Sequence, residues 1–293
     1  KFATQHIDIM NKEFLNLGVW MDWENPYLTL SDDYIEAIWH AFKEAHKKNL
    51  LYLGKYPIHV CPRCETAVAY NEIEYAKQKD NSVFVKFPIV DKKNSYLIIW
   101  TTTPWTLPAN TGVMVGPKII YRELELENGE KWIVASELAH KLIEKFDLEC
   151  KKFKEIKGKE LEGLKYSNPL KEHINVKVNN GYRVVLSDRY VTTSEGTGLV
   201  HCAPGHGKED YEVGKENGLD MPCPVGSDGM LDSSAGKYAG KKARIVDSEI
   251  IEDLKKDGFL VGVDKHEHDY PLCWRDKSPL LMITQPQWFL KIS

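Results

Sequence analysis

Two short segments of this 293-residue sequence hold side chains that packing alone does not explain. The first runs from Trp100 to Asn110 and gathers four threonines, two prolines and two tryptophans directly after an apolar stretch. Because Pro104 and Pro108 interrupt strand pairing, hydroxyl and backbone groups are left to bind something other than a sheet. Neutral hydroxyls suit a ribose, an ester carbonyl or a water, and not a phosphate or a metal. A threonine-rich edge strand that ends in a proline loop would produce the same pattern, so this segment alone leaves both interpretations open.

The second segment, from Gly196 to Tyr211, combines two histidines, several glycines and an aspartate. Its pattern predicts a short apolar strand that ends at His201, a tight turn, and a helix that begins near Lys208. Asp210 then lies in the first helical turn, where the helix dipole favours an ionised carboxylate that could pair with a substrate ammonium. A lone histidine at a strand end is usually a packing residue, and an aspartate at a helix start is common. Their occurrence together favours a binding site.

A cysteine pair, Cys61-Pro62-Arg63-Cys64, lies upstream of both segments. In a cytosolic protein this spacing indicates a metal ligand pair or a redox pair before it indicates a disulfide. Six cysteines are too few for a disulfide framework in a chain of this length. The pair is therefore a candidate metal or redox site.

The composition is that of an ordinary globular protein, with 42% hydrophobic and 28% charged residues. The 39 basic and 43 acidic residues give a net charge of −4, which argues against a general nucleic-acid coat and allows only a local basic patch. The first ten residues show no secretory signal, and the most apolar stretch, residues 96–100, is far too short to cross a bilayer. We therefore expect a cytoplasmic protein without a membrane partner.

The elements that must position these side chains follow from hydrophobic periodicity. A helix is expected from the polar cap at residues 31–33 to Lys48, and the Asn128-Gly129 pair predicts a hairpin. Residues 266–268 (His-Glu-His) are expected to form a solvated polar turn. Strands are expected at residues 82–87, 95–100, 112–115, 119–126, 131–135 and 182–186, and further helices at 137–146, 208–217 and 247–256. Many short strands with few helices predict an α+β fold built on a closed or partly closed barrel.

Taken together, the two segments resemble the editing site of the class I aminoacyl-tRNA synthetases for isoleucine, valine and leucine. The run from Thr101 to Asn110 is similar to the threonine-rich peptide of that family, and the run from Gly196 to Asp210 resembles its second signature. The Ala-Pro-Gly-His-Gly sequence at residues 203–207 is the isoleucyl variety. The resemblance extends over nearly the whole chain, including residues 17–27, 228–240 and 270–275.

The resemblance implies a fragment of an isoleucyl-tRNA synthetase that contains the editing domain, also called connective peptide 1. It implies a helical remnant of the nucleotide-binding (Rossmann) domain at residues 1–54, a linker ribbon with the cysteine pair at 55–81, a barrel-like editing domain at 82–262 and a return ribbon at 263–293. The two ATP-binding signatures of class I synthetases do not occur in the sequence. We therefore expect no amino-acid activation by this chain, with ATP and magnesium serving only the missing synthetic domain.

The activity implied by the resemblance is hydrolysis of the ester in valyl-tRNA(Ile) by a positioned water, without a covalent nucleophile. The implied partners are the 3′ end of tRNA(Ile) with a noncognate amino acid, and the remainder of the synthetase. Asp210 would hold the ammonium of the amino acid, and His201 would border the side-chain pocket. The resemblance assigns chemical roles to Asp210, Thr101, Thr102, Thr103 and His201, and substrate contacts to Trp105, Thr106, Asn110, Gly198, His206 and Gly207.

The family often has a second cysteine pair, written Cys-Trp-Arg-Cys, which here becomes Cys273-Trp274-Arg275-Asp276. Together with Cys61 and Cys64, Cys273 and Asp276 would hold a structural zinc ion, since aspartate is an allowed zinc ligand. The aspartate departs from the family pattern, so a weakened or empty site is the alternative to bound zinc. Editing itself would need no cofactor.

Two other functions remain open from the sequence. A valyl-type site would remove threonine, although residues 203–207 favour the isoleucyl type. A non-catalytic, zinc-braced tRNA-binding module would leave Asp210 and the threonine cluster without a pocket to serve.

Overall fold

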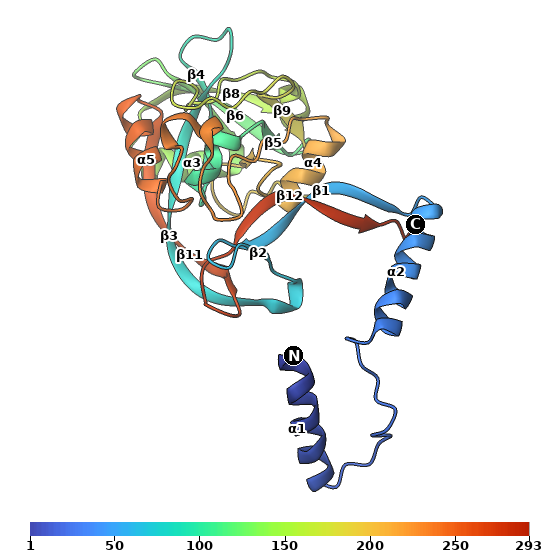
Figure 1. The fold of residues 1–293 in the computed structure, drawn as a ribbon. Coiled ribbons are helices and arrows are strands. Elements are labelled where there is room, and N and C mark those ends of the chain that lie inside the picture. The colour runs from blue at the N-terminus through green and yellow to red at the C-terminus, as the bar shows by residue number, and fades with distance from the viewer. Residues whose placement is uncertain (293) are drawn as a thin grey trace. The chain divides into compact units, whose positions relative to one another are not determined.

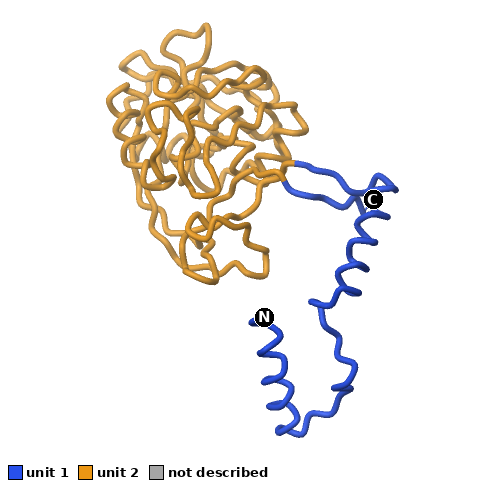
Figure 2. Tube along the Cα trace, viewed as in Figure 1, with its two compact units in different colours: residues 1–54, 287–293 blue, residues 55–286 orange. Residues whose placement is uncertain are grey.

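The computed structural model describes residues 1–292 and divides into two units (Figure 2). The first unit holds residues 1–54 together with the C-terminal residues from Gln287 onward, and the second holds Lys55–Pro286. The division at residue 54 lies where the sequence places the end of the nucleotide-binding remnant. The end of the expected return ribbon belongs instead with the first unit.

The first unit contains two helices, α1 (Phe2–Asn16) and α2 (Asp32–Lys47). The predicted helix after residue 31 is confirmed, and its cap is the Ser31 side chain, which accepts a hydrogen bond from the backbone N–H of Tyr34. α1 has no counterpart among the helices expected from periodicity. None of the residues of either helix is buried.

The second unit is built on a mixed, curled half-barrel sheet of nine strands (Figure 1). Its order is β8-β6-β7-β4-β10-β5-β9, while β3 pairs with the other edge of β4 and β11 pairs with β3. β8 and β9 are the two ends of this path and do not pair with each other in the described part of the chain, so the sheet has the partly closed form of the predicted barrel. The strands are β3 (Ile73–Pro88), β4 (Ser95–Thr101), β5 (Gly112–Val115), β6 (Ile120–Leu126), β7 (Lys131–Ala135), β8 (Cys150–Lys157), β9 (Arg183–Leu186), β10 (Leu199–Cys202) and β11 (Leu260–Cys273).

Alternating and apolar segments produce this sheet, as expected from their periodicity. All six predicted strands are present, and β6 and β7 form the antiparallel hairpin predicted at Asn128-Gly129. The centre of β4, Leu97 to Ile99, is fully buried and forms the middle of the core. The three further predicted helices are present as α3 (Ser136–Lys145), α4 (Lys208–Glu216) and α5 (Asp247–Lys256). The unit also contains four short 3-10 helices, η1 (Tyr70–Glu72), η2 (Pro104–Ala109), η3 (Gly158–Leu161) and η4 (Ser233–Tyr238).

The prediction of a polar turn at residues 266–268 is wrong, because these residues lie in the middle of β11. β11 pairs with β3 in one antiparallel register from Gly262 to Cys273, and the two strands run on beyond the sheet as a long ribbon (Figure 1). His266 and His268 lie on the same side of this ribbon and stack on each other, with ring centroids 5.5 Å apart. A polar sequence is compatible with a strand here because a two-stranded ribbon exposes much of its surface.

A second, three-stranded sheet has the order β12-β1-β2, with β1 (Leu51–Cys61), β2 (Thr66–Ala67) and β12 (Leu281–Leu290). Cys61 ends β1, and Cys64 lies in the turn that leads to β2. Among residues 1–292, no helix combines the length and the apolar character needed to span a membrane.

Candidate functional site

Strand pairing brings the two chemically unusual segments together. β4 and β10 are parallel neighbours, with Trp100 opposite Val200. Both strands therefore end at the same edge of the sheet, and each is followed by a turn and a helix, η2 after β4 and α4 after β10. The carboxyl ends of parallel strands are where open α/β sheets place their binding sites. The threonines that follow β4 and the histidine that ends β10 thus share one edge.

A cavity of about 280 Å³ lies at this edge. Hydroxyl groups line one side of it and the turn between β10 and α4 lines the other. Its lining residues are Trp100, Thr101, Thr102, Thr103, Thr106, Thr192, Glu195, Thr197, Gly198, Leu199, Val200, His201, Ala203, His206 and Asp210. No lysine or arginine is among them, so the cavity suits a neutral or cationic group and not a phosphate.

His201 is a wall residue whose two ring nitrogens both have partners. Nε2 lies 2.9 Å from Thr106 Oγ1, and Nδ1 lies 2.8 Å from Asn110 Nδ2. Thr106 Oγ1 in turn donates to the carbonyl of Thr103 at 2.8 Å. Burial lowers the pKa of His201 to about 3, and the neighbouring His206 adds to this effect. The ring is therefore neutral at physiological pH.

Asp210 stands in the first turn of α4, and its Oδ2 accepts the backbone N–H of Ala203 at 2.9 Å. From its position in the helix the sequence predicts a side chain that stays ionised. Its surroundings act in the other direction: burial raises the pKa of Asp210 to about 7, against a smaller lowering by the Ala203 N–H. Desolvation exceeds the helix dipole because the cavity removes the carboxylate from bulk water. An arriving cation would restore the ionised form.

His206 lines the cavity, and one of its ring nitrogens is buried without a hydrogen-bond partner in the described residues. Its Nδ1 lies 3.1 Å from the carbonyl of Met282 and must donate to it, since a carbonyl can only accept. Nε2 then carries a lone pair, and this buried atom has no hydrogen-bond partner among residues 1–292. The ring packs edge-on against Trp105, and burial lowers the pKa of His206 to about 4. A neutral imidazole with an unused acceptor is suited to a donor on a ligand.

The loop before β10 needs glycine at Gly198. Its φ is +76°, and a Cβ there would lie 2.3 Å from the Cβ of Ala135. Tyr121 fixes the same residue by donating its hydroxyl hydrogen to the Gly198 carbonyl at 2.9 Å. The backbone N–H of Ala135 also bonds the carbonyl of Thr197 at 2.8 Å. The cavity wall is thus fastened to β6 and β7.

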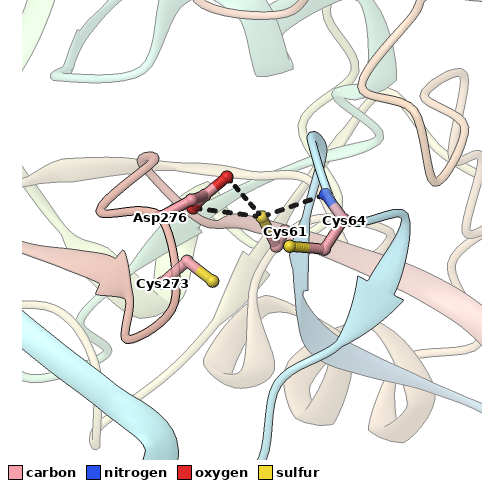
Figure 3. A group of neighbouring side chains, drawn as sticks. All are labelled: Cys61, Cys64, Cys273 and Asp276. Carbon is pink, nitrogen blue, oxygen red and sulfur yellow. Dashed lines mark hydrogen bonds between the residues drawn. The ribbon is translucent and has the colours of Figure 1, made fainter.

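A second cluster of polar side chains lies at the far end of the β3–β11 ribbon (Figure 3). One ligand atom from each of Cys61, Cys64, Cys273 and Asp276 lies within 4.8 Å of the others. Ser278 holds Asp276 with its backbone N–H at 3.0 Å and its hydroxyl at 2.9 Å. Burial raises the pKa of Cys61 to about 12. Three thiols and a held carboxylate that converge at this spacing fit the tetrahedral donor set of zinc.

Comparison with known proteins decides the family. The family model for class I tRNA synthetases (I, L, M and V) matches residues 1–293. The chain belongs to this family. The isoleucine–tRNA ligase of Pyrococcus horikoshii is 46% identical over 100% of the chain and 28% of its own length. Those of Methanocaldococcus jannaschii and Methanothermobacter marburgensis are 45% and 44% identical, with 29% and 27% of their own lengths covered.

The chain therefore spans less than a third of the length of these curated relatives. A solved structure described as "The crystal structure of GlLeuRS-CP1" aligns with 63% of the chain and 98% of its own, at a TM-score of 0.47 and 16% identity.

Most of the residues to which the synthetase resemblance assigns chemical roles or substrate contacts line the cavity, but three of them do not. Trp105 and Asn110 are 3% and 0% exposed and stand behind the wall, where they contact His206 and His201. Gly207 is the N-cap of α4, and a Cβ there would lie 3.0 Å from the carboxylate of Asp210. These three residues can shape the site without touching a ligand.

Two lining residues, Thr192 and Glu195, were not singled out from the sequence. They precede the Gly-Thr-Gly turn in a Thr-Thr-Ser-Glu run at residues 192–195. The signal in the sequence that could have identified them as lining residues is the hydroxyl-rich composition of this run, directly before a glycine turn and an apolar strand.

Proposed function

We propose that this chain hydrolyses the ester bond of tRNA that carries the wrong amino acid, and that its main substrate is valyl-tRNA(Ile). The observation that supports this most directly is one cavity lined by both the half-buried carboxylate of Asp210 and a group of threonines. This combination matches the two ends of an aminoacyl ester, an ammonium at one end and a ribose at the other. The partners are then the 3′ end of tRNA(Ile) and the remainder of the synthetase.

Asp210 binds the α-ammonium group of the amino acid. An α-amino group has a pKa of about 8, so it is largely protonated where the buried carboxylate is half ionised. Contact between the two stabilises both charges and lowers the pKa of Asp210.

The threonine hydroxyls position the ribose, the ester carbonyl and the attacking water. Thr101 Oγ1 accepts the backbone N–H of Thr103 at 3.2 Å, which orders the turn after β4. Hydroxyls held in this way act as preorganised donors to the oxygen that becomes negative in the transition state. Positioning of the water beside the ester supplies the remainder of the rate enhancement.

The chemical balance is that of a simple hydrolysis. The water oxygen forms a bond to the ester carbonyl carbon, and the bond from that carbon to the ribose oxygen breaks. The proton lost by the water is transferred to the ribose oxygen. Free valine and tRNA with an unmodified terminal ribose are released, and no covalent intermediate with the protein forms.

Selectivity follows from volume. Double-sieve editing is an established scheme for isoleucyl-tRNA synthetases, and its logic applies to this cavity. A pocket lined by fixed side chains excludes an additional methylene by overlap, whereas it cannot exclude a smaller side chain in that way. We therefore assign valine as accepted and isoleucine as refused, with the rigid imidazole of His201 at the boundary.

The test is deacylation of valyl-, isoleucyl- and threonyl-tRNA(Ile) by the purified chain. We expect release of valine and retention of isoleucine. The Asp210→Asn variant should lose at least about a hundredfold in kcat/KM, because removal of one member of a buried ion pair costs about 3–5 kcal/mol. Glu216→Gln, which removes an exposed carboxylate from the same helix, is the matched control and should remain active.

Three outcomes would contradict this proposal. Release of isoleucine at the rate of valine would show that the cavity does not select by size. Faster release of threonine than valine would favour a valyl-type site. Binding of tRNA without release of any amino acid would favour a non-catalytic module.

We also propose a structural zinc ion at Cys61, Cys64, Cys273 and Asp276. The converging ligand atoms support it, and the ion would brace the turn after β1 against the end of β11. When bound, the ion would take the place of the thiol protons and hold the cysteines as thiolates. It has no part in ester hydrolysis.

A further inference from the structure

Tyr166 lies outside the cavity but adjoins the side chains that form its wall. It is 2% exposed and packs against Phe87, with ring centroids 5.3 Å apart. Its hydroxyl donates to Oδ1 of Asn110 at 2.6 Å. Burial raises the pKa of Tyr166 well above its ordinary value, so the hydroxyl remains a donor.

The orientation of the Asn110 amide follows from its neighbours. Its Nδ2 lies 2.8 Å from the carbonyl oxygen of Gly112 and 3.3 Å from that of Cys202. Both of these oxygens can only accept and the Tyr166 hydroxyl donates, so the three neighbours together hold the amide nitrogen toward the carbonyls and Oδ1 toward Tyr166. Its two hydrogens go to the two nearest acceptors, the Gly112 carbonyl and Nδ1 of His201, each 2.8 Å away, and the Cys202 carbonyl shares one of them at longer range. Because the amide nitrogen cannot accept, Nδ1 of His201 carries no hydrogen.

The ring hydrogen of His201 is consequently on Nε2 and points to Thr106 Oγ1, 2.9 Å away. Thr106 uses its own hydrogen on the carbonyl of Thr103. The result is a one-way series of hydrogen bonds that starts at the Tyr166 hydroxyl, passes through Asn110, His201 and Thr106, and ends at the Thr103 carbonyl. Every hydrogen in the series is committed, which is the condition under which a buried polar network specifies one arrangement.

We propose that Tyr166 is a positioning residue for the site, which locks His201 through Asn110 as a neutral Nε2–H donor and so holds the hydroxyl of Thr106 and the backbone carbonyl of Thr103 in place. His201 in this state has no free lone pair and does not take a proton from the attacking water. Its role is that of a rigid, neutral wall. The effect on turnover rests on the proposed hydrolysis. The fixed tautomer of His201 does not, because it is a property of the folded chain without substrate.

The test compares Tyr166→Phe with a matched variant, Tyr238→Phe. Tyr238 is also fully buried and also donates its hydroxyl hydrogen to a side chain, Asp253 at 2.8 Å, but it does not line the cavity or contact His201. The primary measurement is the ¹⁵N spectrum of histidine side chains, which distinguishes the two neutral tautomers. The second is the kcat and KM of valyl-tRNA(Ile) deacylation.

In the wild-type chain we expect the Nε2–H form of His201 alone between about pH 5 and 8. Tyr166→Phe leaves Oδ1 of Asn110 without its donor, and we expect the tautomer ratio to shift about tenfold, the equivalent of one hydrogen bond of about 1.4 kcal/mol. Turnover should fall about tenfold in kcat with little change in KM. Tyr238→Phe should lose stability but keep the wild-type spectrum and kcat.

A wild-type Nδ1–H signal for His201, or an unchanged tautomer ratio in Tyr166→Phe, would overturn the inference. These results are independent of catalysis, so they decide the question even if the wild-type chain releases no valine and the proposed function fails. A wild-type chain that deacylates, together with a Tyr166→Phe variant of equal kcat, would also overturn it.

Discussion

Replacement of Asp210 by asparagine should make the protein more stable while it abolishes the proposed hydrolysis. Asparagine has the same shape and keeps an oxygen for the Ala203 N–H, but it carries no charge that needs hydration. Burial raises the pKa of Asp210 from 3.8 to about 7 in the folded chain. The carboxylate therefore costs folding free energy wherever it is ionised.

The direction with pH follows from proton linkage. Between about pH 4 and pH 7 the folded chain keeps the Asp210 proton and the unfolded chain does not. The free energy of unfolding contributed by this group therefore falls as pH rises through that window, and it is constant above it. A difference of about three pKa units corresponds to at most about 4 kcal/mol. Since the cavity admits water, we expect about 1–3 kcal/mol.

The measurement is urea unfolding of wild-type and Asp210→Asn chains at about pH 4 and pH 8. The variant should exceed the wild type by about 1–3 kcal/mol at the higher pH and by much less at the lower pH. Burial also raises the pKa of Asp247 to about 7. Because Asp247 is present in both chains, its contribution to the pH dependence cancels when their free energies of unfolding are subtracted. An equal difference at both pH values, or a less stable variant at pH 8, would refute the reasoning.

Further predictions concern the backbone, the thiol cluster and the pH dependence of turnover. Gly198→Ala should lower the free energy of unfolding in urea by about 1–3 kcal/mol more than Gly129→Ala, because both glycines have positive φ but only a side chain at Gly198 would clash with a neighbour. Equal losses in the two variants would contradict this. Cys273→Ser should reduce zinc from about one ion per chain to a small fraction by elemental analysis, whereas Cys150→Ser, outside the cluster, should not; equal zinc in both variants would exclude the site. The kcat/KM for valyl-tRNA should fall about tenfold per pH unit below about pH 7, as Asp210 becomes protonated, and a flat profile would show that its charge is not used.

Much of the second unit could be predicted from the sequence because its strands are short, apolar and bounded by turn residues. β4 and β5 are examples in which local pattern and final burial agree. β11 could not be predicted in the same way. Its polar centre is a strand only because residues 73–85 of the chain lie beside it, and no local pattern contains that information.

The residues of the candidate site were easier to find than their roles. Asn110 was expected at the ligand, and the structure places it behind His201, since only the fold shows which face of a segment is covered. The protonation of Asp210 was also not predictable from helix position, because desolvation depends on residues far away in the sequence. Tyr166 carries no local motif at all. Its relation to the site exists only through Asn110.

The single register pair that joins β10 to β4 has a consequence for how such a site can diversify. β10 takes its position from β5, with four paired residues, and meets β4 only where Val200 faces Trp100. The two halves of the cavity lie about a hundred residues apart in the chain, but the hydrogen bond between His201 Nε2 and Thr106 Oγ1 joins them. A substitution that reshapes the half around His201 therefore leaves the threonine half unchanged only if it keeps a donor for Thr106.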